Sequence, residues 1–560
     1  MKTLISALNA KYVHSSLAVR CIKKYCAGFD VETKDYTIND STDAIISDIF
    51  EKNPDVTAFS CYIWNVEKVL YICECLKKAN PKFITVLGGL EVSYDAKDVM
   101  EKNGFIDFII SGEGEIPFKS LLQTLQNGGD FKNVPSLTYR ENGEILQNEK
   151  LGLCDINDYP FVYDSADELK NKIVYYESSR GCPYNCSYCL SGEGSRVSFL
   201  DTARVKDELM FFINNNIPLV KFVDRTFNAD RKRADEIFDF IIKNTKNTKF
   251  HCELAGDLIT DKTLEILKNA PEGVIQFEIG VQSTNEKTIS AIGRKIDFDK
   301  LKDKIVPLIN LKTIHIHLDL IAGLPYEDIE SFKKSFNDVI ALRPHMLQLG
   351  FLKLLKGSRI RNEAEKYGYV FKSKAPYEII SNDFMTFADI FYLKKIEQML
   401  DKFYNSGEFE QSMNYLFEKF ESRFEIFDLL VKYFEKNRLF EIGLSPDMLC
   451  DAIKNTFANF KNFADCAEFD RMTNPKCKKK DDFEGNAKLK SACFEFLKDT
   501  GMTHKYLPGF ENFPAKKLVK FIQIRRFFNK FWLFNLKNNQ YCDITEDFVK
   551  FCIESAQKVW

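Results

Sequence analysis

The sequence predicts an α/β protein with two successive parallel sheets, followed by an all-α C-terminal region. Apolar runs of strand length alternate with helical patterns over residues 1–130, and the same alternation returns over residues 171–370. Strands that alternate with helices pair in parallel, so each stretch predicts a sheet covered by helices. Beyond residue 370 the alternation stops, and apolar residues recur at three- and four-residue spacing, as in amphipathic helices.

Composition limits the class of protein. The chain has 560 residues, of which 45% are hydrophobic and 28% charged, and its net charge is −3. This is a globular composition with no overall positive charge, so a nucleic-acid partner is not expected. The chain runs directly into a strand pattern without a signal peptide or a long apolar segment. We therefore expect a cytoplasmic protein without a membrane segment, whose 16 cysteines are free thiols or metal ligands.

The first stretch carries glycines at two strand ends. Strands are expected at 3–8, 32–38, 56–64, 83–87 and 106–110, with helices at 17–26, 42–50, 66–78, 96–102 and 116–125. The glycine loops are Gly88-Gly89 and Gly112-Glu113-Gly114. Ligands bind at the carboxyl ends of parallel strands, and glycines allow the backbone to approach them closely. The alternative is that these glycines only form the turns from strand to helix.

A connector is expected between the two stretches. Short strands at 136–139 and 144–147 flank Asn142-Gly143, which is a strong hairpin signal. The polar, turn-rich segment 155–167 that follows indicates a linker across the surface.

Three cysteines stand close together in one loop at the start of the second stretch. Cys182, Cys186 and Cys189 are spaced closely enough to reach one metal centre, and thiolates favour zinc or iron–sulfur clusters. Structural zinc and ordinary clusters take four ligands, whereas this loop offers three. The alternatives are a cluster with one open iron, a zinc site completed by a remote residue, and cysteines that serve as small core residues.

With Tyr188 at the aromatic position, the loop resembles the Cys-x-x-x-Cys-x-aromatic-Cys signature of the radical S-adenosylmethionine (SAM) superfamily. The resemblance implies that Cys182, Cys186 and Cys189 hold a catalytic [4Fe-4S] cluster whose open iron chelates SAM. One electron then cleaves SAM to methionine and a deoxyadenosyl radical, which abstracts hydrogen from a substrate. It also implies an electron donor such as flavodoxin or ferredoxin, and anaerobic chemistry.

The second stretch resembles the partial (β/α)6 barrel of that superfamily. Its six expected strands are 173–176, 219–223, 249–254, 274–279, 314–320 and 347–351. Catalytic groups of such barrels lie at the carboxyl ends of the strands. The resemblance therefore assigns the SAM pocket to Tyr188, Arg180, Asp224, Glu253, Glu278, Gln282, Ser283 and Asp319. For each of these, the alternative is a strand-end cap or an ion pair.

The first stretch resembles the Rossmann-like, doubly wound cobalamin-binding domain that precedes many radical SAM cores. This resemblance implies cobalamin at Gly88, Gly89, Gly112, Glu113 and Gly114, with Val13, Tyr62 and Leu90 near the corrin ring. The Asp-x-His motif of cobalamin mutases is missing, and His14 is the only histidine in this stretch. We therefore expect no histidine from that motif on cobalt. The alternative is a scaffold without the cofactor.

The remainder resembles a helical domain of unknown function. Helices are expected at 387–403, 409–420 and 424–434. A basic stripe near the end is predicted to cover a helix face above aromatic residues, or else to bind an anionic partner. The stripe consists of Lys516, Lys517, Lys520, Arg525 and Arg526.

These expectations give four segments and one function. The segments are a cobalamin-binding-like domain at 1–132, a connector at 133–170, a radical SAM core at 171–372 and a helical domain at 373–560. The expected function is cobalamin-dependent methyl transfer to an unactivated carbon of a small-molecule or peptide substrate. The alternatives are a radical rearrangement without cobalamin and a non-catalytic, metal-binding regulatory protein.

Overall fold

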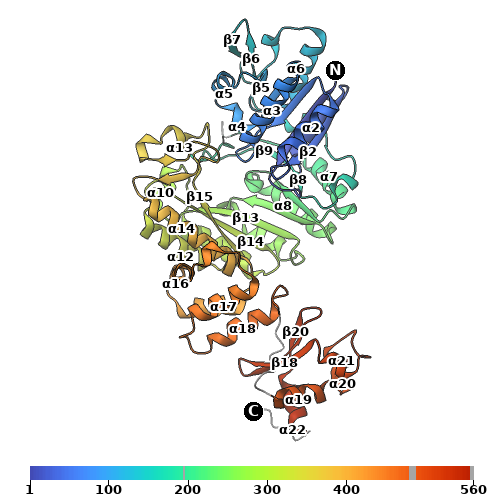
Figure 1. Cartoon of the computed structure of the whole chain (residues 1–560), viewed down its shortest axis with the longest axis vertical. Coiled ribbons are helices and arrows are strands. Elements are labelled where there is room, and N and C mark those ends of the chain that lie inside the picture. The colour runs from blue at the N-terminus through green and yellow to red at the C-terminus, as the bar shows by residue number, and fades with distance from the viewer. Residues whose placement is uncertain (193–195, 479–486, 555–560) are drawn as a thin grey trace. The chain divides into compact units, whose positions relative to one another are not determined.

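The computed structural model describes residues 1–192, 196–478 and 487–554 (Figure 1). The chain divides into two compact units, Met1–Ile390 and Phe391–Trp560. Within the described residues, no helix combines the length and the apolar character needed to cross a bilayer.

The first unit begins with a seven-stranded sheet in the order β2-β1-β3-β4-β5-β6-β7. Its strands are β1 (Thr3–Asn9), β2 (Val31–Thr37), β3 (Val56–Ser60), β4 (Ile84–Gly88), β5 (Phe108–Ile110), β6 (Leu137–Glu141) and β7 (Glu144–Gln147). Its helices are α1 (Leu17–Tyr25), α2 (Thr42–Lys52), α3 (Val66–Ala79), α4 (Leu90–Ser93), α5 (Ala96–Lys102) and α6 (Glu115–Asn127). The strands β1 to β5 are parallel, as predicted.

Each face of this sheet has its own apolar core. Side chains of α2, α3 and α5 pack on one face, around Leu4 and Phe59. Side chains of α1 and α6 pack on the other face, around Ile5 and Val86. Burial of alternate side chains on both faces is the expected result of a parallel, doubly wound sheet. The carboxyl ends of the strands therefore form a free edge between two helical layers.

The hairpin that the sequence suggests for the connector belongs to this sheet. β6 pairs antiparallel with β5, and β7 pairs with β6. Leu137 and Tyr139 of β6 are buried in the same core as Phe108 of β5. The hairpin thus covers an edge strand whose backbone groups would otherwise lack partners.

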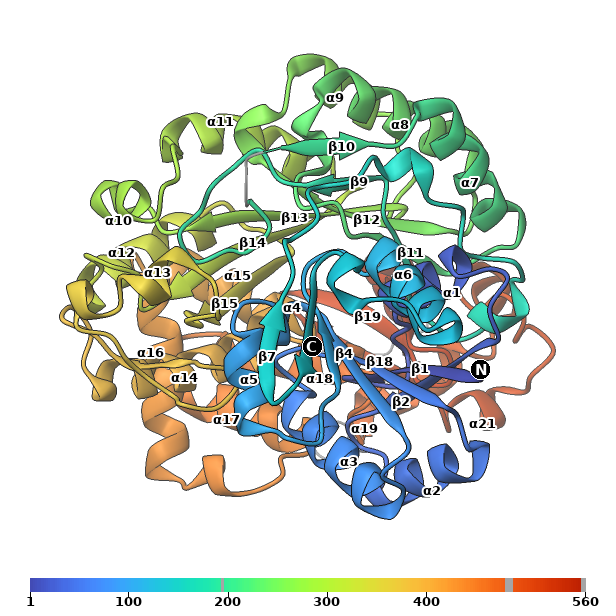
Figure 2. The same ribbon diagram turned by 90° about the horizontal axis from the view of Figure 1, so that it is seen from above.

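The second sheet has six parallel strands in the order β8-β11-β12-β13-β14-β15, as predicted. They are β8 (Val174–Tyr176), β11 (Leu219–Phe222), β12 (Lys249–Leu254), β13 (Ile275–Gln282), β14 (His315–Ala322) and β15 (Met346–Phe351). The covering helices are α7 (Thr202–Asn214), α8 (Arg231–Asn244), α9 (Asp261–Leu267), α10 (Glu286–Ala291), α11 (Phe298–Asn310) and α12 (Ile329–Ile340). They follow the outer side of the curved sheet (Figure 2).

Alternation along the strands separates the two faces of this sheet. In β14, Ile316, Leu318 and Leu320 are buried, whereas His317 and Asp319 between them are only partly buried. Successive side chains of a strand point to opposite faces, so the polar residues share the inner side. This inner side is the concave face of the partial barrel.

Shorter elements surround the second sheet. β9 (Ser179–Gly181) pairs antiparallel with β10 (Val197–Phe199), and the cysteine loop leaves β9 at Gly181. After β15 come α13 (Arg359–Asn362) and the small hairpin of β16 (Val370–Phe371) and β17 (Ile379–Ser381). The helix α14 (Phe387–Leu400) then spans the boundary between the two units.

The second unit is mostly helical, but the prediction that it is all-α is wrong. Its helices are α15 (Glu410–Lys419), α16 (Arg423–Lys436), α17 (Pro446–Thr456), α18 (Phe463–Thr473), α19 (Ala487–Phe496), α20 (Thr500–Tyr506), α21 (Ala515–Leu518) and α22 (Thr545–Glu554). Between the last two lies a three-stranded antiparallel sheet of β18 (Ile522–Phe527), β19 (Lys530–Asn535) and β20 (Gln540–Asp543).

The predicted basic stripe is divided by this sheet. Lys516 and Lys517 lie on α21, whereas Arg525 and Arg526 lie on β18. Ile522 and Ile524 alternate with polar residues and are buried against α19 and α22, which is the burial period of a strand. The stripe is therefore not one face of a helix.

Candidate cofactor-binding site

A large cavity lies at the carboxyl ends of the strands of the first sheet. Its volume is about 770 Å³, within the range of small-molecule sites. The predicted glycine loops line it, namely Gly88, Gly89, Gly112, Glu113 and Gly114. The second sheet and its cysteine loop supply further lining residues, among them Tyr175, Arg180, Gly181, Leu190, Ser191 and Arg225. One cavity therefore borders both the glycine loops and the start of the cysteine loop.

Gly89 keeps the first glycine loop close to the sheet. Its φ is +102°, and a Cβ atom at this position would stand 2.5 Å from the carbonyl oxygen of Cys61. Only glycine fits both the backbone conformation and the space. Because the loop turns tightly here, the space beyond the strand ends stays open for a ligand.

An aromatic pair forms part of the cavity wall. The rings of Tyr62 and Trp64 stack with centroids 4.4 Å apart and an interplanar angle of 6°. Both line the cavity, as does Leu90, and Trp64 is 46% exposed. Val13 is 39% exposed and is not among the lining residues, in contrast to the expectation for it. A flat, partly exposed aromatic surface next to glycine loops fits a large planar ligand such as a corrin.

His14 also lines the cavity. Its Nδ1 atom lies 2.6 Å from the hydroxyl of Tyr175. Burial and the nearby charges of Lys11, Lys221 and Lys172 lower the pKa of its imidazole. One nitrogen of a neutral ring is therefore already occupied by Tyr175.

The three predicted cluster cysteines differ in exposure. Cys182 and Cys186 are buried, and Cys189 is exposed. The Sγ atom of Cys182 lies 3.4 Å from Oγ1 of Thr226, and the backbone N–H of Ser191 donates to Sγ of Cys189 at 3.4 Å. Polar partners of this kind orient thiolate ligands around a metal site.

The cysteine loop offers three thiols as donors. No three His, Cys, Asp or Glu side chains in the described ranges stand where they could hold one metal ion. In an iron–sulfur cluster each thiolate binds a different iron. The donor set fits a cluster with three protein ligands.

Arg294 adjoins the cysteine loop and was not found from the sequence. Its Nη1 donates to Sγ of Cys186 at 3.9 Å and to the hydroxyl of Tyr188 at 3.3 Å, and its Nη2 donates to the carbonyl of Gly280 at 3.0 Å. The residue follows a short helix and belongs to no local motif. Only the packing of that helix beside the loop identifies it.

Two predicted pocket residues have buried polar atoms without a partner among the described residues. They are Oε1 of Gln282 and Oδ1 of Asp319. Gln282 has a φ of +71° at an irregularity in β13, and burial together with Glu278 and Glu253 raises the pKa of Asp319. Unpaired buried polar atoms are costly, so they fit a ligand with hydroxyl and amino groups such as SAM.

Asp224 and Ser283 are buried and already have hydrogen-bond partners within the protein. Asp224 is fully buried, and its carboxylate accepts from the backbone N–H of Ser178 and from the hydroxyls of Ser178 and Ser179. Ser283 is 1% exposed and donates to Glu327 at 2.5 Å. Their assignment to the SAM pocket stays a prediction. The sequence predicts polar residues at strand ends, but it does not reveal these remote partners.

Glu253 and Glu278 lie on the inner side of the second sheet with other charged groups. Glu253 lies 4.0 Å from Nη1 of Arg225. Glu278 lies 3.3 Å from Nε2 of His251 and 3.5 Å from Nζ of Lys221, and hydrogen bonding to His251 with the charge of Lys221 lowers its pKa to about 2.

The histidines of the second stretch gather on this inner side. The ring centroid of His315 lies 4.7 Å from that of His317 and 4.8 Å from that of His345. Burial is the main cause that lowers the pKa of both His315 and His317 to about 4. His315 and His317 lie two residues apart on β14, whereas His345 comes from the loop before β15.

Arg180 points toward the first sheet. Its guanidinium forms ion pairs with Glu177, Glu113 and Glu115 at 2.7, 3.3 and 3.0 Å. Arg180 thus joins the cysteine loop to the second glycine loop, and its assignment to the SAM pocket stays a prediction.

Comparison with known families agrees with this geometry. Residues 4–122 match the B12 binding domain, and residues 176–339 match the radical SAM superfamily. Residues 365–545 match a protein family of unknown function, DUF4080. The three matches follow the order that the sequence predicts.

Individual proteins are similar over part of their length. The cobalamin-dependent radical SAM methyltransferase TokK of Streptomyces tokunonensis is 26% identical over 333 residues, which cover 53% of this chain and 47% of TokK. The anaerobic magnesium-protoporphyrin IX monomethyl ester cyclase of Synechocystis sp. is 27% identical over 238 residues, covering 40% of this chain and 47% of the cyclase. This chain thus spans about half the length of these relatives.

A solved structure shares the fold. The cobalamin-dependent SAM radical enzyme OxsB, with aqua-cobalamin and SAM bound, superposes with a TM-score of 0.59 at 14% identity, over 83% of this chain and 80% of OxsB. The chain therefore contains a B12 binding domain followed by a radical SAM domain, and these two domains imply cobalamin, a [4Fe-4S] cluster and SAM as cofactors.

Proposed function

We propose that this protein is a methyltransferase that transfers a methyl group to an unactivated carbon. The observation that carries the proposal is the shared cavity wall. Gly88 and Gly89 border the cavity on one side, and Arg180, Gly181 and Leu190 border it at the cysteine loop. When bound, the cluster supplies the electron that cleaves SAM, and cobalamin supplies the methyl group.

Different residues of the chain would hold the different cofactors. Cys182, Cys186 and Cys189 would hold the cluster, and Gln282 and Asp319 would accept hydrogen bonds from SAM through their unpaired oxygens. Tyr62 and Trp64 would carry the corrin ring on their stacked faces. Walls from both sheets would limit the access of bulk water to the reacting groups.

A second candidate is a radical oxidation or rearrangement without methyl transfer. It is favoured by the relative from Synechocystis, which is named a cyclase. The methyltransferase is preferred because TokK, named as a methyltransferase, matches over more of this chain. We propose further that the substrate is a small molecule or peptide, that flavodoxin or ferredoxin supplies electrons, and that the protein works in the reducing cytoplasm.

The test uses the full-length chain, reconstituted anaerobically with iron, sulfide and cobalamin. It is incubated with reductant, SAM carrying an isotopically labelled methyl group, and a small-molecule extract from a strain that lacks the gene. We expect deoxyadenosine together with a labelled, methylated compound in the extract. The Cys186→Ala variant is the control and should give neither product.

The outcomes separate the candidates. Deoxyadenosine with a changed but unlabelled extract compound would favour the cyclase-like reaction. A chain that binds iron and SAM but never forms deoxyadenosine would contradict both candidates.

A further inference from the structure

We propose that Arg180 is a positioning residue that clamps the second glycine loop to the cysteine loop and thereby sets the spacing of the two cofactors. This inference rests on the proposed function, because it assumes that cobalamin and the cluster occupy the two loops. Arg180 itself need not touch either cofactor.

The clamp joins three carboxylates to one guanidinium. Arg180 Nη2 lies 2.7 Å from Glu177, in the same segment, and 3.0 Å from Glu115, while Nη1 lies 3.3 Å from Glu113. The arginine side chain is 16% exposed and that of Glu115 is 7% exposed. A planar guanidinium presents its donors in a rigid fork, so it fixes direction as well as distance.

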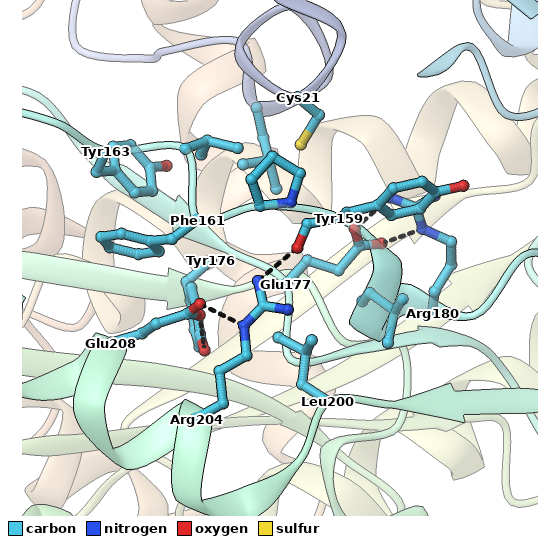
Figure 3. A pocket seen from close by; sticks show the side chains of 14 residues that line it. Cys21, Tyr159, Phe161, Tyr163, Tyr176, Glu177, Arg180, Leu200, Arg204 and Glu208 are labelled. Atoms are coloured by element: carbon cyan, nitrogen blue, oxygen red, sulfur yellow. Dashed lines mark hydrogen bonds and ion pairs between the residues drawn. The ribbon is translucent and has the colours of Figure 1, made fainter. Parts of the chain in front are cut away.

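Tyr159 completes the clamp from the linker segment. The guanidinium carbon of Arg180 lies 4.9 Å from the centre of the Tyr159 ring, and the hydroxyl of Tyr159 donates to Glu113 at 3.0 Å. Figure 3 shows Tyr159, Glu177 and Arg180 together. Glu113 is thus held from two sides, by an ion pair and by a hydrogen bond.

Both ends of the clamp lie next to cofactor-binding backbone. Glu113 stands between Gly112 and Gly114, which line the cavity and have little intrinsic rigidity. Arg180 is followed by Gly181, whose φ is +98° and whose Cβ would stand 2.1 Å from the carbonyl oxygen of Arg196. The backbone at Gly181 therefore packs closely against that of Arg196. Cys182 follows Gly181 directly.

One oxygen of Glu113 takes no part in the clamp. Its Oε1 is buried and has no hydrogen-bond partner among the described residues, while the residue lines the cavity. The amide side chains of cobalamin are donors that such an oxygen accepts. Loss of Arg180 would leave buried carboxylates uncompensated, so the loop that carries Glu113 should move away from the cysteine loop.

Arg204 offers a matched control in the same place. Its Nε bonds Glu208 at 2.7 Å, and its Nη atoms donate to the backbone carbonyls of Asn157 and Tyr159 at 3.1 and 2.6 Å. It holds the same linker segment as Tyr159 and lies beside Glu177 in Figure 3. Its bonds therefore support the packing of the linker, whereas those of Arg180 reach the glycine loop.

The experiment compares the full-length parent with Arg180→Gln, Arg180→Lys and Arg204→Gln after anaerobic reconstitution. Hydroxocobalamin titration gives the affinity, and electron paramagnetic resonance of the reduced, cobalamin-loaded protein gives the magnetic interaction between cluster and cobalt. Arg180→Gln should weaken cobalamin binding by roughly ten- to a hundred-fold, as loss of outer partners does at metal sites. The same variant should keep its iron content but show a different magnetic interaction between the cluster and cobalt.

Arg180→Lys is the conservative variant, and Arg204→Gln is the control. Arg180→Lys keeps the charge but not the fork, so it should fall between the parent and Arg180→Gln. Arg204→Gln removes only support of the linker that carries Tyr159, so it should change both measurements less than Arg180→Gln does. Equal affinity and an equal magnetic interaction in the parent and Arg180→Gln would overturn the inference.

Two further results remain decisive. If Arg180→Gln does not fold, Glu115→Gln replaces it in the test, because this variant keeps the arginine and removes one ion pair. An altered magnetic interaction in Glu115→Gln supports the clamp, and an unaltered one overturns it. If the parent binds no cobalamin, the proposed function fails, and the inference fails with it. If the parent binds cobalamin and Arg180→Gln equals it in both measurements, the inference is overturned. The proposed function is then not affected.

Discussion

The carboxylate of Glu91 accepts a hydrogen bond from the hydroxyl of Tyr377, 286 residues further along the chain. Nζ of Lys356 lies 3.2 Å from the same carboxylate and 3.0 Å from Asp95. Glu91 is 3% exposed and lies in α4, directly after Gly89. The first glycine loop is therefore anchored to the segment that follows the second sheet.

Removing Lys356 should destabilise the first unit. In Lys356→Met the buried carboxylate of Glu91 loses its cation, which costs roughly 3–5 kcal/mol for a fully buried pair and less here, since the lysine side chain is 17% exposed. Urea unfolding followed by fluorescence measures the change. Lys372→Met is the control, because the Lys372 side chain is 52% exposed in its pair with Glu378. Equal stability of the two variants would contradict the anchor.

Gly89→Ala should abolish cobalamin retention. The added Cβ would stand 2.5 Å from the carbonyl oxygen of Cys61, and alanine disfavours a φ of +102°. The loop must then shift into the cavity. Desalting after incubation with hydroxocobalamin measures retention by absorbance.

The neighbouring glycine supplies the control for this prediction. A Cβ at Gly88 would meet nothing nearer than the carbonyl oxygen of Ile110, at 3.8 Å. Gly88→Ala should therefore retain cobalamin better than Gly89→Ala. Full retention by Gly89→Ala would show that the tight turn is not needed.

Glu327 should make stability depend on pH. Burial raises its pKa to about 7, although it accepts hydrogen bonds from Ser283 and Ser335. The folded state therefore binds a proton more tightly than the unfolded state, whose pKa is about 4.5. The stabilisation is complete below pH 4.5 and is lost as the pH rises through 7. The free energy of unfolding should fall by roughly 3 kcal/mol over this range.

Glu327→Gln isolates this contribution. The amide keeps the shape of the side chain and does not ionise, so the variant should lose less stability than the parent between pH 5 and pH 8, as judged by unfolding midpoints at about half-unit steps. The same slope in the parent and the variant would show that Glu327 does not carry the effect.

Arg294 should raise the reduction potential of the cluster. Its Nη1 donates to Sγ of Cys186, and a nearby cation stabilises the more negative, reduced cluster. In Arg294→Gln the potential should fall by an amount on the order of tens of millivolts, measured by redox titration with electron paramagnetic resonance. Tyr188→Phe leaves the arginine in place and should change the potential less. A potential that does not differ between Arg294→Gln and the parent would remove Arg294 from this role.

The sequence predicts most of both sheets because alternation of strand and helix is a local pattern. The parallel strands from β1 to β5 and the six of the second sheet lie where apolar runs indicate them. The sheet of β18 to β20 was missed because the lysines and arginines around Ile522 and Ile524 suggest an amphipathic helix. The hairpin of β18 and β19 turns through Phe528 and Asn529, both with positive φ, which is a weaker signal than Asn-Gly.

The candidate site was predicted in its local parts and missed in its remote ones. Gly89 lies in a recognisable loop at a strand end, and its close approach to the backbone of Cys61 agrees with the alternative that the glycine forms the turn from strand to helix. The partners of Arg180 and Ser283 come from distant segments, so spacing along the chain did not reveal them. Arg294 carries no motif at all and becomes visible only beside Cys186.

The central claim is that one chain holds the cluster and cobalamin at a shared cavity. The most direct measurement is the iron, sulfide and cobalamin content of the anaerobically reconstituted full-length protein after gel filtration, with Cys186→Ala and Gly89→Ala beside it. The account predicts about four irons per chain and stoichiometric cobalamin in the parent, loss of iron in the first variant and loss of cobalamin in the second. A colourless parent that contains zinc, or no metal and no cobalamin, would contradict it.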